Sequence, residues 1–521
     1  MNKALIVFGL LLFAQHATAN IESTAEIKAP DGTFVGISTA TGQQFLGIPY
    51  AEPPVGELRW AAPRPLSNKP GRFIAQKFGS RCVQPINMWN FNPKPGEAMH
   101  GSEDCLFLNI YASRKQTSSK PVMVWIHGGG FVTGAGEEYD VHVLAEKHDV
   151  IVLTINYRLG ALGFLSHPTF GEESGNFGLL DQQMALRWVQ RNIAAFGGDP
   201  KRVTIFGESA GGVSVCMQLG SPEAKGLYSR AIDQSGPCVA IDRKIADQKG
   251  VRYAQAAGCT ASEQDVLGCL RKLPALTAAA NSPGDAGLGD TAWTLVSGTK
   301  VVPKMGPNFT RVYENGEFNH VPFMNGSNLD EGKLFAMAAM SLLKSEGDYQ
   351  KNVQLQFGSK ADQVLAQYPA SGYKLPALAY AAYITDWLFA CPALGASQAI
   401  ARYSPVYAYE FSDRAAPSHS VPPEEIGGLG AYHAAEIQYV FQTKSPWGGP
   451  AEFTPEQKRL SDQMQEAWVS FARDGVPSIA GEVPWEPLRP GKERVRILAP
   501  DGPAYVSDFT GRHNCSFWFA Q

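Results

Sequence analysis

A serine stands in a short glycine-rich stretch that could make it a nucleophile. Ser209 is the central residue of Gly207–Gly211, which has the pattern G-x-S-x-G. The β-branched and aromatic run Val203–Phe206 predicts a buried strand before it, and the small apolar residues 212–219 predict a helix after it. Between a strand and a helix, such a serine lies on a sharp turn with its hydroxyl exposed, and the flanking glycines avoid a collision. This context favours a nucleophilic serine over a chance glycine–serine loop.

A second glycine-rich stretch could stabilise a negative charge. The apolar run Pro121–Ile126 predicts a central strand and leads directly into His127–Phe131, which contains three glycines in a row. Glycines leave the backbone free to turn N–H groups into a cavity, where each donor to an oxyanion is worth on the order of 2.7–4 kcal/mol. A phosphate-binding loop is the competing interpretation, but the P-loop lysine and the G-x-G-x-x-G spacing are missing. We therefore predict an oxyanion hole here, with His127 holding the loop through backbone hydrogen bonds.

A base and an acid follow the serine in the order that α/β hydrolases use. Of the ten histidines, His433 lies in a loop after the last predicted core strand. Asp330 and Glu331 come just past the end of the predicted strand 321–326, where a triad acid belongs. Spacing leaves these two acids open, and a solvated acidic turn is the alternative. In this chemistry the imidazole takes the serine proton, the carboxylate holds its tautomer, and water resolves the acyl-enzyme.

The elements around these residues predict the fold class. Strands and helices alternate along the chain, which favours an α/β fold with a large, mostly parallel central sheet and helices on both faces. Residues 240–300 are helical and then glycine-rich, which indicates a helical cap insertion. No repeat or low-complexity linker divides the chain, so we expect one α/β-hydrolase domain over residues 20–521.

Composition and charge exclude several classes of partner. Hydrophobic residues make up 44% of the 521-residue chain and charged residues 18%, as in ordinary globular proteins. The formal net charge of −4 argues against nucleic acid as a partner and against a general attraction to anionic membranes. No motif calls for a metal or a cofactor, and the sequence leaves the oligomeric state open.

The N-terminus predicts export. Residues 1–19 combine Lys3, an apolar run and Ala17–Ala19, which fits an A-x-A cleavage site before Asn20. The alternative is a membrane anchor, but the apolar run is short for a bilayer. No later stretch is predicted to be long and apolar enough to span one, so we expect no stable membrane anchor in the mature chain. We expect a secreted or periplasmic protein.

An oxidising compartment permits disulfides between the eight cysteines. Their positions favour Cys82–Cys105 around a loop, Cys259–Cys269 over a short separation, and Cys391–Cys515 at the C-terminus, although spacing alone does not prove a pairing. Cys216 in the helix after Ser209 and Cys238 after an apolar strand are expected to be buried free thiols.

With these residues placed, residues 25–520 resemble the type-B carboxylesterase and cholinesterase family of α/β hydrolases. The resemblance rests on the glycine turn and on six further motifs: Phe45–Ala51, Glu103–Leu106, Gly175–Gln182, Phe206–Gly212, Asn328–Gly332 and Tyr432–His433.

The resemblance implies a role for each matching residue. The triad would be Ser209, Glu331 and His433, which selects Glu331 over Asp330. It further implies oxyanion donors at the backbone N–H groups of Gly129, Gly130 and Ala210, and a buried polar network of Glu208, Ser235 and Glu436. The three disulfides expected above also match the family pattern. The activity implied is hydrolysis of a small carboxylic ester.

The choice of ester is a narrower question. Trp89 resembles the cation-binding tryptophan of cholinesterases, where a quaternary ammonium would stack, although it could equally pack its own loop. Where cholinesterases supply aromatic residues after Gly332, this chain has Lys333 and Leu334, followed by Phe335. We therefore expect short-to-medium, mostly uncharged esters, with Trp89, Leu334 and Phe335 as candidate pocket residues. Choline esters, a lipase and a non-catalytic adhesion or binding homologue are the alternatives. The three filled triad positions argue against the last, and the lack of an obvious long apolar lid argues against a lipase.

Overall fold

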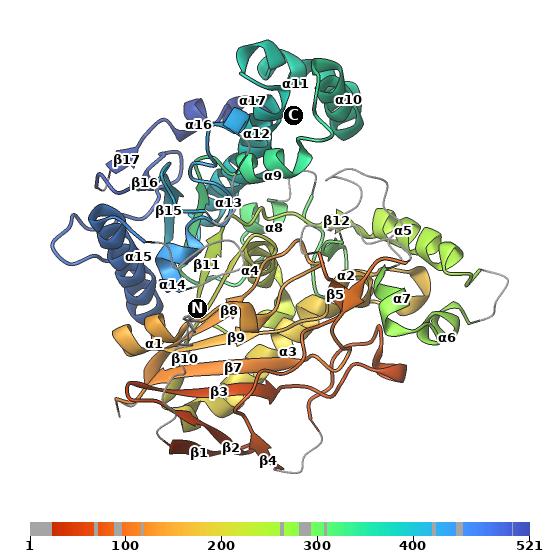
Figure 1. Cartoon of the computed structure of the whole chain (residues 1–521), viewed down its shortest axis with the longest axis vertical. Helices are drawn as coiled ribbons and strands as arrows, with labels where there is room; N and C mark the ends of the chain where they lie inside the picture. The colour runs from red at the N-terminus through yellow and green to blue at the C-terminus, as the bar shows by residue number, and fades with distance from the viewer. Residues whose placement is uncertain are drawn as a thin grey trace, which may run out of the picture.

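The structure is a computed structural model in which a twisted sheet runs through the molecule between layers of helices (Figure 1). It describes residues 23–66, 71–87, 96–115, 119–260, 265–280, 293–306, 310–418, 422, 424–443, 452–502 and 504–520. The predicted signal peptide and Trp89 lie outside the described residues, so both stay predictions.

The main sheet, counted over the described residues, has thirteen strands. They are β1 (Ser23–Ala29), β2 (Gly32–Ser38), β3 (Gly42–Pro49), β4 (Gly71–Ile74), β7 (Phe107–Ser113), β8 (Lys120–Ile126), β9 (Ile151–Ile155), β10 (Gly198–Glu208), β11 (Arg230–Gln234), β14 (Phe323–Asn328), β15 (Val406–Phe411), β16 (Val495–Leu498) and β17 (Ala504–Val506). Two short pairs lie apart: β5 (Gln84–Pro85) with β6 (Met99–His100), and β12 (Ile241–Asp242) with β13 (Val296–Ser297).

The strand order is β1-β2-β3-β7-β9-β8-β10-β11-β14-β15-β16-β17, with β4 beside β2. From β9 to β16 all neighbours are parallel, and the strands at the two ends pair mostly antiparallel. The carboxyl ends of β8, β10, β14 and β15 therefore meet at one edge of the sheet, and the predicted site residues follow these ends.

The helices form two covering layers and the cap regions. They are α1 (His142–His148), α2 (Gly160–Phe164), α3 (Phe177–Asn192), α4 (Ala210–Gly220), α5 (Arg243–Ala256), α6 (Val266–Arg271), α7 (Ala275–Ala280), α8 (Arg311–Glu314), α9 (Gly332–Ala339), α10 (Glu346–Phe357), α11 (Ala361–Gln367), α12 (Pro376–Ile384), α13 (Cys391–Ile400), α14 (Ile437–Phe441), α15 (Pro455–Asp474), α16 (Phe509–Arg512) and α17 (Cys515–Phe519). In Figure 1, α5–α7 and α9–α12 stand away from the sheet as two helical caps.

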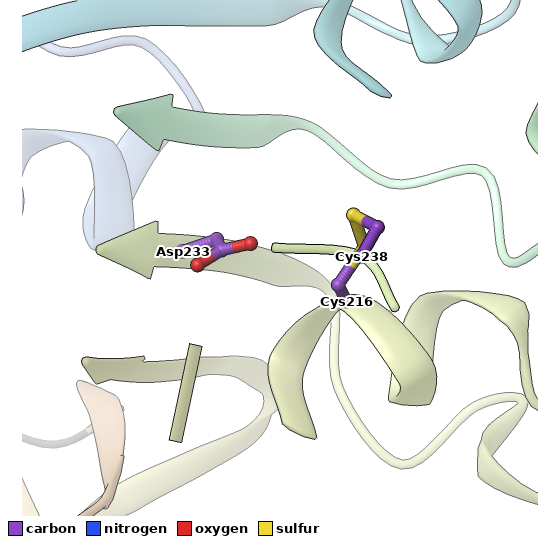
Figure 2. A group of neighbouring side chains, drawn as sticks. All are labelled: Cys216, Asp233 and Cys238. Atoms are coloured by element: carbon purple, nitrogen blue, oxygen red, sulfur yellow. A yellow bond between two sulfur atoms is a disulfide. The ribbon is translucent and has the colours of Figure 1, made fainter. Parts of the chain in front are cut away.

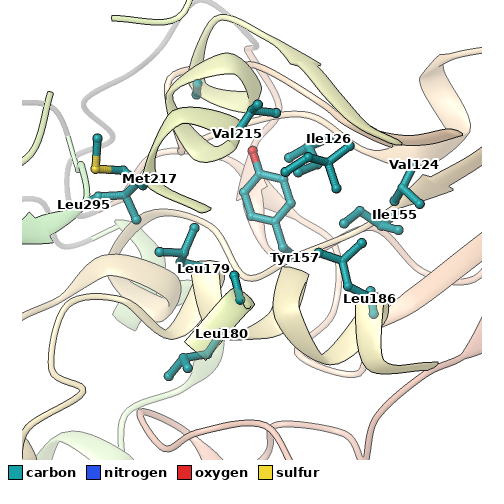
Figure 3. Close-up of a cluster of buried hydrophobic side chains, with 14 of the residues drawn as sticks. Val124, Ile126, Ile155, Tyr157, Leu179, Leu180, Leu186, Val215, Met217 and Leu295 are labelled. Atoms are coloured by element: carbon teal, nitrogen blue, oxygen red, sulfur yellow. The ribbon is translucent and has the colours of Figure 1, made fainter. Parts of the chain in front are cut away.

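Successive side chains of the central strands point to opposite faces of the sheet and are buried on both, so they join two different cores in turn. In β8, Val124 and Ile126 join the core that α3 and α4 cover, whereas Met123 and Trp125 join the core that α1, α14 and α15 cover. Figure 3 shows the first core around Tyr157, which lies among side chains of β8, β9, α3 and α4. Both faces of the parallel sheet are thus buried, and the predicted α/β-hydrolase fold class is confirmed.

Four disulfides lie in the described part of the chain. Cys82–Cys105, Cys259–Cys269 and Cys391–Cys515 pair as the sequence led us to expect. The expectation of free thiols at Cys216 and Cys238 is wrong, because these two residues form the fourth disulfide. Helix α4 packs directly on β11, which brings a residue inside the helix next to one just beyond the strand. Four disulfides are consistent with an extracellular location.

The sequence predicts no stretch after the signal peptide that is long and apolar enough to span a membrane, but the structure contains one such helical run. Pro376–Ile400 is long and apolar enough to cross a bilayer by length and composition alone, which the sequence analysis did not anticipate. However, 72% of its most apolar window is buried inside the fold, as in a core helix of a globular protein. Its apolar character is therefore used in packing within this chain.

Candidate active site

Ser209 lies on a strained turn between β10 and α4. Its backbone has φ +57° and ψ −122°, a conformation that residues with a side chain rarely adopt. The turn is compact: a Cβ on Gly207 would lie 2.6 Å from the Ile126 carbonyl oxygen, and one on Gly211 would collide with the same atom. The glycines of the motif therefore allow the end of β8 to lie against the start of α4. The position of Ser209 as the residue before α4 leaves Ala210 at the N-terminal end of that helix, where N–H groups lack helical partners.

The glycine turn after β8 folds back on itself. Gly129 and Gly130 have φ of +100° and +61°, and the Gly129 carbonyl accepts the N–H groups of Val132 and Thr133. Gln84 of the short strand β5 stabilises the turn, because its Oε1 accepts hydrogen bonds from the Thr133 hydroxyl and the Gly134 N–H, both at 2.9 Å. Within the described residues, no backbone or side-chain acceptor takes the N–H groups of Gly129, Gly130 or Ala210 outside helix bonds. These groups are consequently available to an oxygen of a substrate.

His127 fixes this turn as expected, through the backbone. Its Nδ1 lies 2.8 Å from the Gly128 carbonyl oxygen, and its ring stacks on Tyr157 with centroids 4.4 Å apart. The Tyr157 hydroxyl donates to the His127 carbonyl at 2.7 Å. Burial lowers the pKa of His127 to about 4, so the ring is neutral at physiological pH and Nδ1–H is the donor.

His433 and Glu331 form a buried pair at the edge of the sheet. Nδ1 of His433 lies 2.7 Å from Oε2 of Glu331, and the other carboxylate oxygen accepts the Asn328 N–H at 2.7 Å. Asp330 turns away: its carboxylate meets Lys333, Arg414 and the Ala431 N–H. The geometry thus separates the two acids that spacing left open, since only Glu331 contacts the imidazole.

Glu208 contacts the opposite nitrogen of the same ring. Its Oε1 lies 3.2 Å from Nε2 of His433, without the alignment of a hydrogen bond. Burial lowers the pKa of His433, but the charges of Glu208 and Glu331 outweigh it and raise the value to about 9. Burial also raises the pKa of the Glu208 carboxyl well above its usual range. Because a proton on Glu208 would remove one charge that holds the proton on His433, the two groups compete for protons across this contact.

The hydrogen bonds around the expected polar network of Glu208, Ser235 and Glu436 involve two further residues, Gln234 and Asn328. Glu436 accepts the side-chain amides of Gln234 at 3.0 Å and Asn328 at 2.6 Å, and burial raises the pKa of its carboxyl. The buried Ser235 hydroxyl has no hydrogen-bond partner among the described residues. Gln234 and Asn328 were not assigned a role from the sequence, although Asn328 opens the motif Asn328–Gly332 and Gln234 directly precedes Ser235.

Two phenylalanines pack on the His433 ring. The centroid of Phe335 lies 5.0 Å from it and that of Phe389 4.8 Å, and the two phenylalanines stack on each other at 5.7 Å. Leu334 is buried in the core that includes Leu429 and Tyr432. No sequence signal marked Phe389, which comes from a π-helical turn, Thr385–Ala390, between α12 and α13.

The fold and the site together define an α/β hydrolase. One edge of the sheet carries a serine on a strained strand–helix turn, backbone N–H donors on a glycine turn, and a histidine bound to a carboxylate. Residues 23–518 match the Carboxylesterase family over almost the whole chain. The chain belongs to this family and is a carboxylic ester hydrolase.

Several characterised proteins are similar to this chain. The para-nitrobenzyl esterase of Bacillus subtilis (strain 168) is 36% identical over 86% of this chain and 89% of its own length. A mouse (Mus musculus) cholinesterase is 32% identical over 98% of this chain and 89% of its own length. Among solved structures, a PNB esterase superposes with a TM-score of 0.79 at 32% identity, covering 94% of this chain and 99% of the other.

Proposed function

We propose that this protein is a secreted serine carboxylester hydrolase that cleaves short-to-medium, mostly uncharged esters through an acyl-enzyme on Ser209. The observation that carries the proposal is the Glu331–His433 contact beside the turn that holds Ser209. Glu208, the residue before Ser209, contacts Nε2 of His433. The edge of the imidazole opposite Glu331 therefore faces the turn that holds Ser209.

The reaction assigns a step to each group. Nε2 of His433 takes the Ser209 proton as the hydroxyl attacks the ester carbonyl, and the N–H groups of Gly129, Gly130 and Ala210 bind the oxyanion. The imidazolium, stabilised by Glu331, then protonates the leaving alcohol. Water attacks the acyl-enzyme by the same route and regenerates Ser209. These residues bring an acid, a base and oxyanion donors to one reacting carbonyl.

The preference for uncharged esters rests on the surroundings of His433. Phe335 and Phe389 present apolar rings beside the imidazole. Lys333, in the first turn of α9, lies 3.3 Å from Asp330, and the two charges compensate each other. This pair therefore offers a cationic substrate no net attraction, whereas an uncharged acyl or alcohol group would pack on the rings.

The test of mechanism is hydrolysis of 4-nitrophenyl esters from acetate to palmitate by the wild type and by Ser209→Ala. We expect the variant to lose about 10⁴-fold or more in kcat. Ser214→Ala, at a buried serine inside helix α4 that follows Ser209, is the control and should keep most of the activity. A fluorophosphonate should label the peptide that carries Ser209. Near-normal turnover of Ser209→Ala, or labelling at another residue, would refute the assignment.

Choline esters are the second candidate, favoured by the likeness to a mouse cholinesterase over 98% of this chain. Acetylthiocholine should be compared with its neutral isostere, in which carbon replaces the quaternary nitrogen. We expect the neutral ester to be cleaved at least as well. A strong preference for the cation that is lost in Trp89→Ala would overturn the ranking.

A further inference from the structure

The fourth disulfide joins two segments next to the proposed nucleophile. Cys216 lies in α4, the helix that begins directly after Ser209, and Cys238 lies in the segment that follows β11 and Ser235 (Figure 2). The disulfide therefore joins helix α4, which follows Ser209, to the segment after β11, which contains Ser235.

A buried carboxyl lies beside this disulfide. One carboxylate oxygen of Asp233 and the sulfurs of Cys216 and Cys238 all lie within 4.8 Å of one another (Figure 2). Asp233 is fully buried, and neither of its oxygens accepts a well-aligned hydrogen bond among the described residues, although the Gly236 N–H lies close enough to offset part of the effect of burial on its pKa. Burial raises the pKa of this carboxyl well above its usual range, which favours its neutral, proton-bearing form.

The local backbone makes room for this carboxyl. A Cβ on Gly212 or on Gly236 would collide with Oδ1 of Asp233, so both positions accommodate the acid only as glycine. Another proton-bearing group lies near the disulfide. The hydroxyl of Tyr313 is 3.2 Å from Sγ of Cys216, but it donates its proton to the Cys216 carbonyl at 2.8 Å. Asp233 is therefore the group near the sulfurs whose proton is not already committed to a hydrogen bond.

The disulfide borders a cavity. Cys238 and Val239 line a space of about 620 Å³ together with Trp387, Leu388 and Cys391. A cavity of this volume admits a small molecule. Cys391 belongs to the Cys391–Cys515 disulfide, so two disulfides border the same space, and only Cys216–Cys238 has a carboxyl close to both sulfurs among the described residues.

We propose that Cys216–Cys238 is a thiol–disulfide exchange site, in which a small dithiol entering the cavity attacks Cys238 and Asp233 protonates the leaving sulfur of Cys216. One thiolate of the dithiol forms a bond to Sγ of Cys238 while the Sγ–Sγ bond breaks. The electron pair of that bond goes to Cys216, and its thiolate takes the proton of Asp233. The second thiol of the reductant gives its proton to Asp233, and its sulfur displaces Cys238, which closes the reductant into a cyclic disulfide. Cys238 leaves as a thiolate and takes from the solvent the proton that the attacking thiol released on ionisation, so both protein cysteines end as thiols.

Reduction would change the site that the disulfide supports. It frees the segment after Ser235 from α4, and Val239 of that segment lines the cavity. The reduced form should therefore differ from the oxidised form in its preference among esters of different acyl length, while Ser209, His433 and Glu331 stay in place.

The test measures the rate at which each disulfide is reduced in the folded protein. Wild type is treated with dithiothreitol under native conditions, free thiols are alkylated at intervals, and the four pairs are quantified by peptide mass spectrometry. We expect Cys216–Cys238 to be reduced before Cys391–Cys515, which borders the same cavity and is the internal control for access. Asp233→Asn should slow reduction of Cys216–Cys238 by about 10²-fold, the lower range for general acid catalysis, and leave the other pairs unchanged.

Two controls keep the proposal open to refutation. Tyr313→Phe removes the other hydroxyl near Cys216 and should leave the rate unchanged, whereas a slowing equal to that of Asp233→Asn would contradict the role of Asp233. If Asp233→Asn does not fold, the order of reduction in the wild type decides alone. Reduction of Cys216–Cys238 no faster than of Cys391–Cys515, or only after loss of near-ultraviolet circular dichroism, would overturn the proposal. These readouts do not depend on ester hydrolysis.

Discussion

Oε2 of Glu331 lies 2.7 Å from Nδ1 of His433, although 102 residues separate them in the chain. Both side chains are buried, and the neighbouring acid, Asp330, is bound instead to Lys333 and Arg414. The neighbouring carboxylates of Asp330 and Glu331 thus have different partners, so substitutions at the two positions should affect ester hydrolysis differently.

Glu331→Gln and Asp330→Asn should separate the two acids. Glutamine keeps the shape of Glu331 but no longer stabilises the imidazolium or holds Nδ1–H, so kcat should fall by about 10⁴-fold. Asp330→Asn weakens partly exposed ion pairs and should keep kcat within a few-fold, as the matched control. Steady-state hydrolysis of a 4-nitrophenyl ester, with circular dichroism as the check on folding, measures both. An equal loss in the two variants would contradict the assignment.

The pH profile of ester hydrolysis should report the contact between His433 and Glu208. General base catalysis needs the neutral imidazole, and the pKa of His433 is raised to about 9, so kcat/KM should rise with pH up to about 9. Burial alone would lower that pKa, and the nearby charges of Glu208 and Glu331 raise it. Glu208→Gln removes one of them and should move the rising limb to lower pH by about 1–3 units. An unmoved limb would mean that Glu208 carries a proton throughout the range.

A second buried histidine should make stability depend on pH. His513 lies between Asp386 at 2.8 Å and Glu410 at 2.7 Å. Burial lowers its pKa, but the two acids raise it to about 9. Because the folded pKa exceeds the ordinary value of 6.5, the added stability is complete below about pH 6.5 and is lost as pH rises through about 9.

The shift corresponds to on the order of 3 kcal/mol. His513→Gln should therefore be less stable than wild type near pH 6, with the gap closing toward pH 10. Urea unfolding at a series of pH values measures the gap, and the difference between the two proteins cancels the contribution of His433. A gap that does not depend on pH would show that His513 is neutral in the fold.

Two ion pairs should differ in their effect on stability. Arg158 binds Asp181 through two side-chain contacts of 2.7 and 2.8 Å, and both side chains are buried. Asp181→Asn leaves the guanidinium charge buried without its counter-charge and should lower the free energy of unfolding by about 3–5 kcal/mol. Glu26→Gln, in the exposed Arg72–Glu26 pair, is the control and should cost about 0–1 kcal/mol. Urea unfolding of the three proteins measures this, and similar losses would contradict the argument.

Features that depend on neighbouring residues alone could be predicted from the sequence. The turn at Ser209 was predictable because a strand, two glycines and a helix leave few backbone conformations at the residue between them. The complete burial of β8 likewise follows from its run of apolar residues, since both faces of a central parallel strand are covered.

Other features depended on how distant segments pack. Asp330 and Glu331 are equivalent by spacing, and the position of α9 at the end of β14 decides which one faces His433. Phe389 contacts His433 from the π-helical turn between α12 and α13, a segment that no sequence motif linked to the site. Cys216 and Cys238 were mistaken for free thiols because neither position marks a loop, and the packing of α4 on β11 brings their sulfurs together. The sequence alone therefore determined the fold class, the turn that holds Ser209 and the order of the proposed triad residues, because these follow from local backbone sterics and periodicity. The family resemblance favoured Glu331, but only the tertiary structure showed its contact with His433, the aromatic rings beside His433 and the pairing of Cys216 with Cys238, because those contacts join segments that are far apart along the chain.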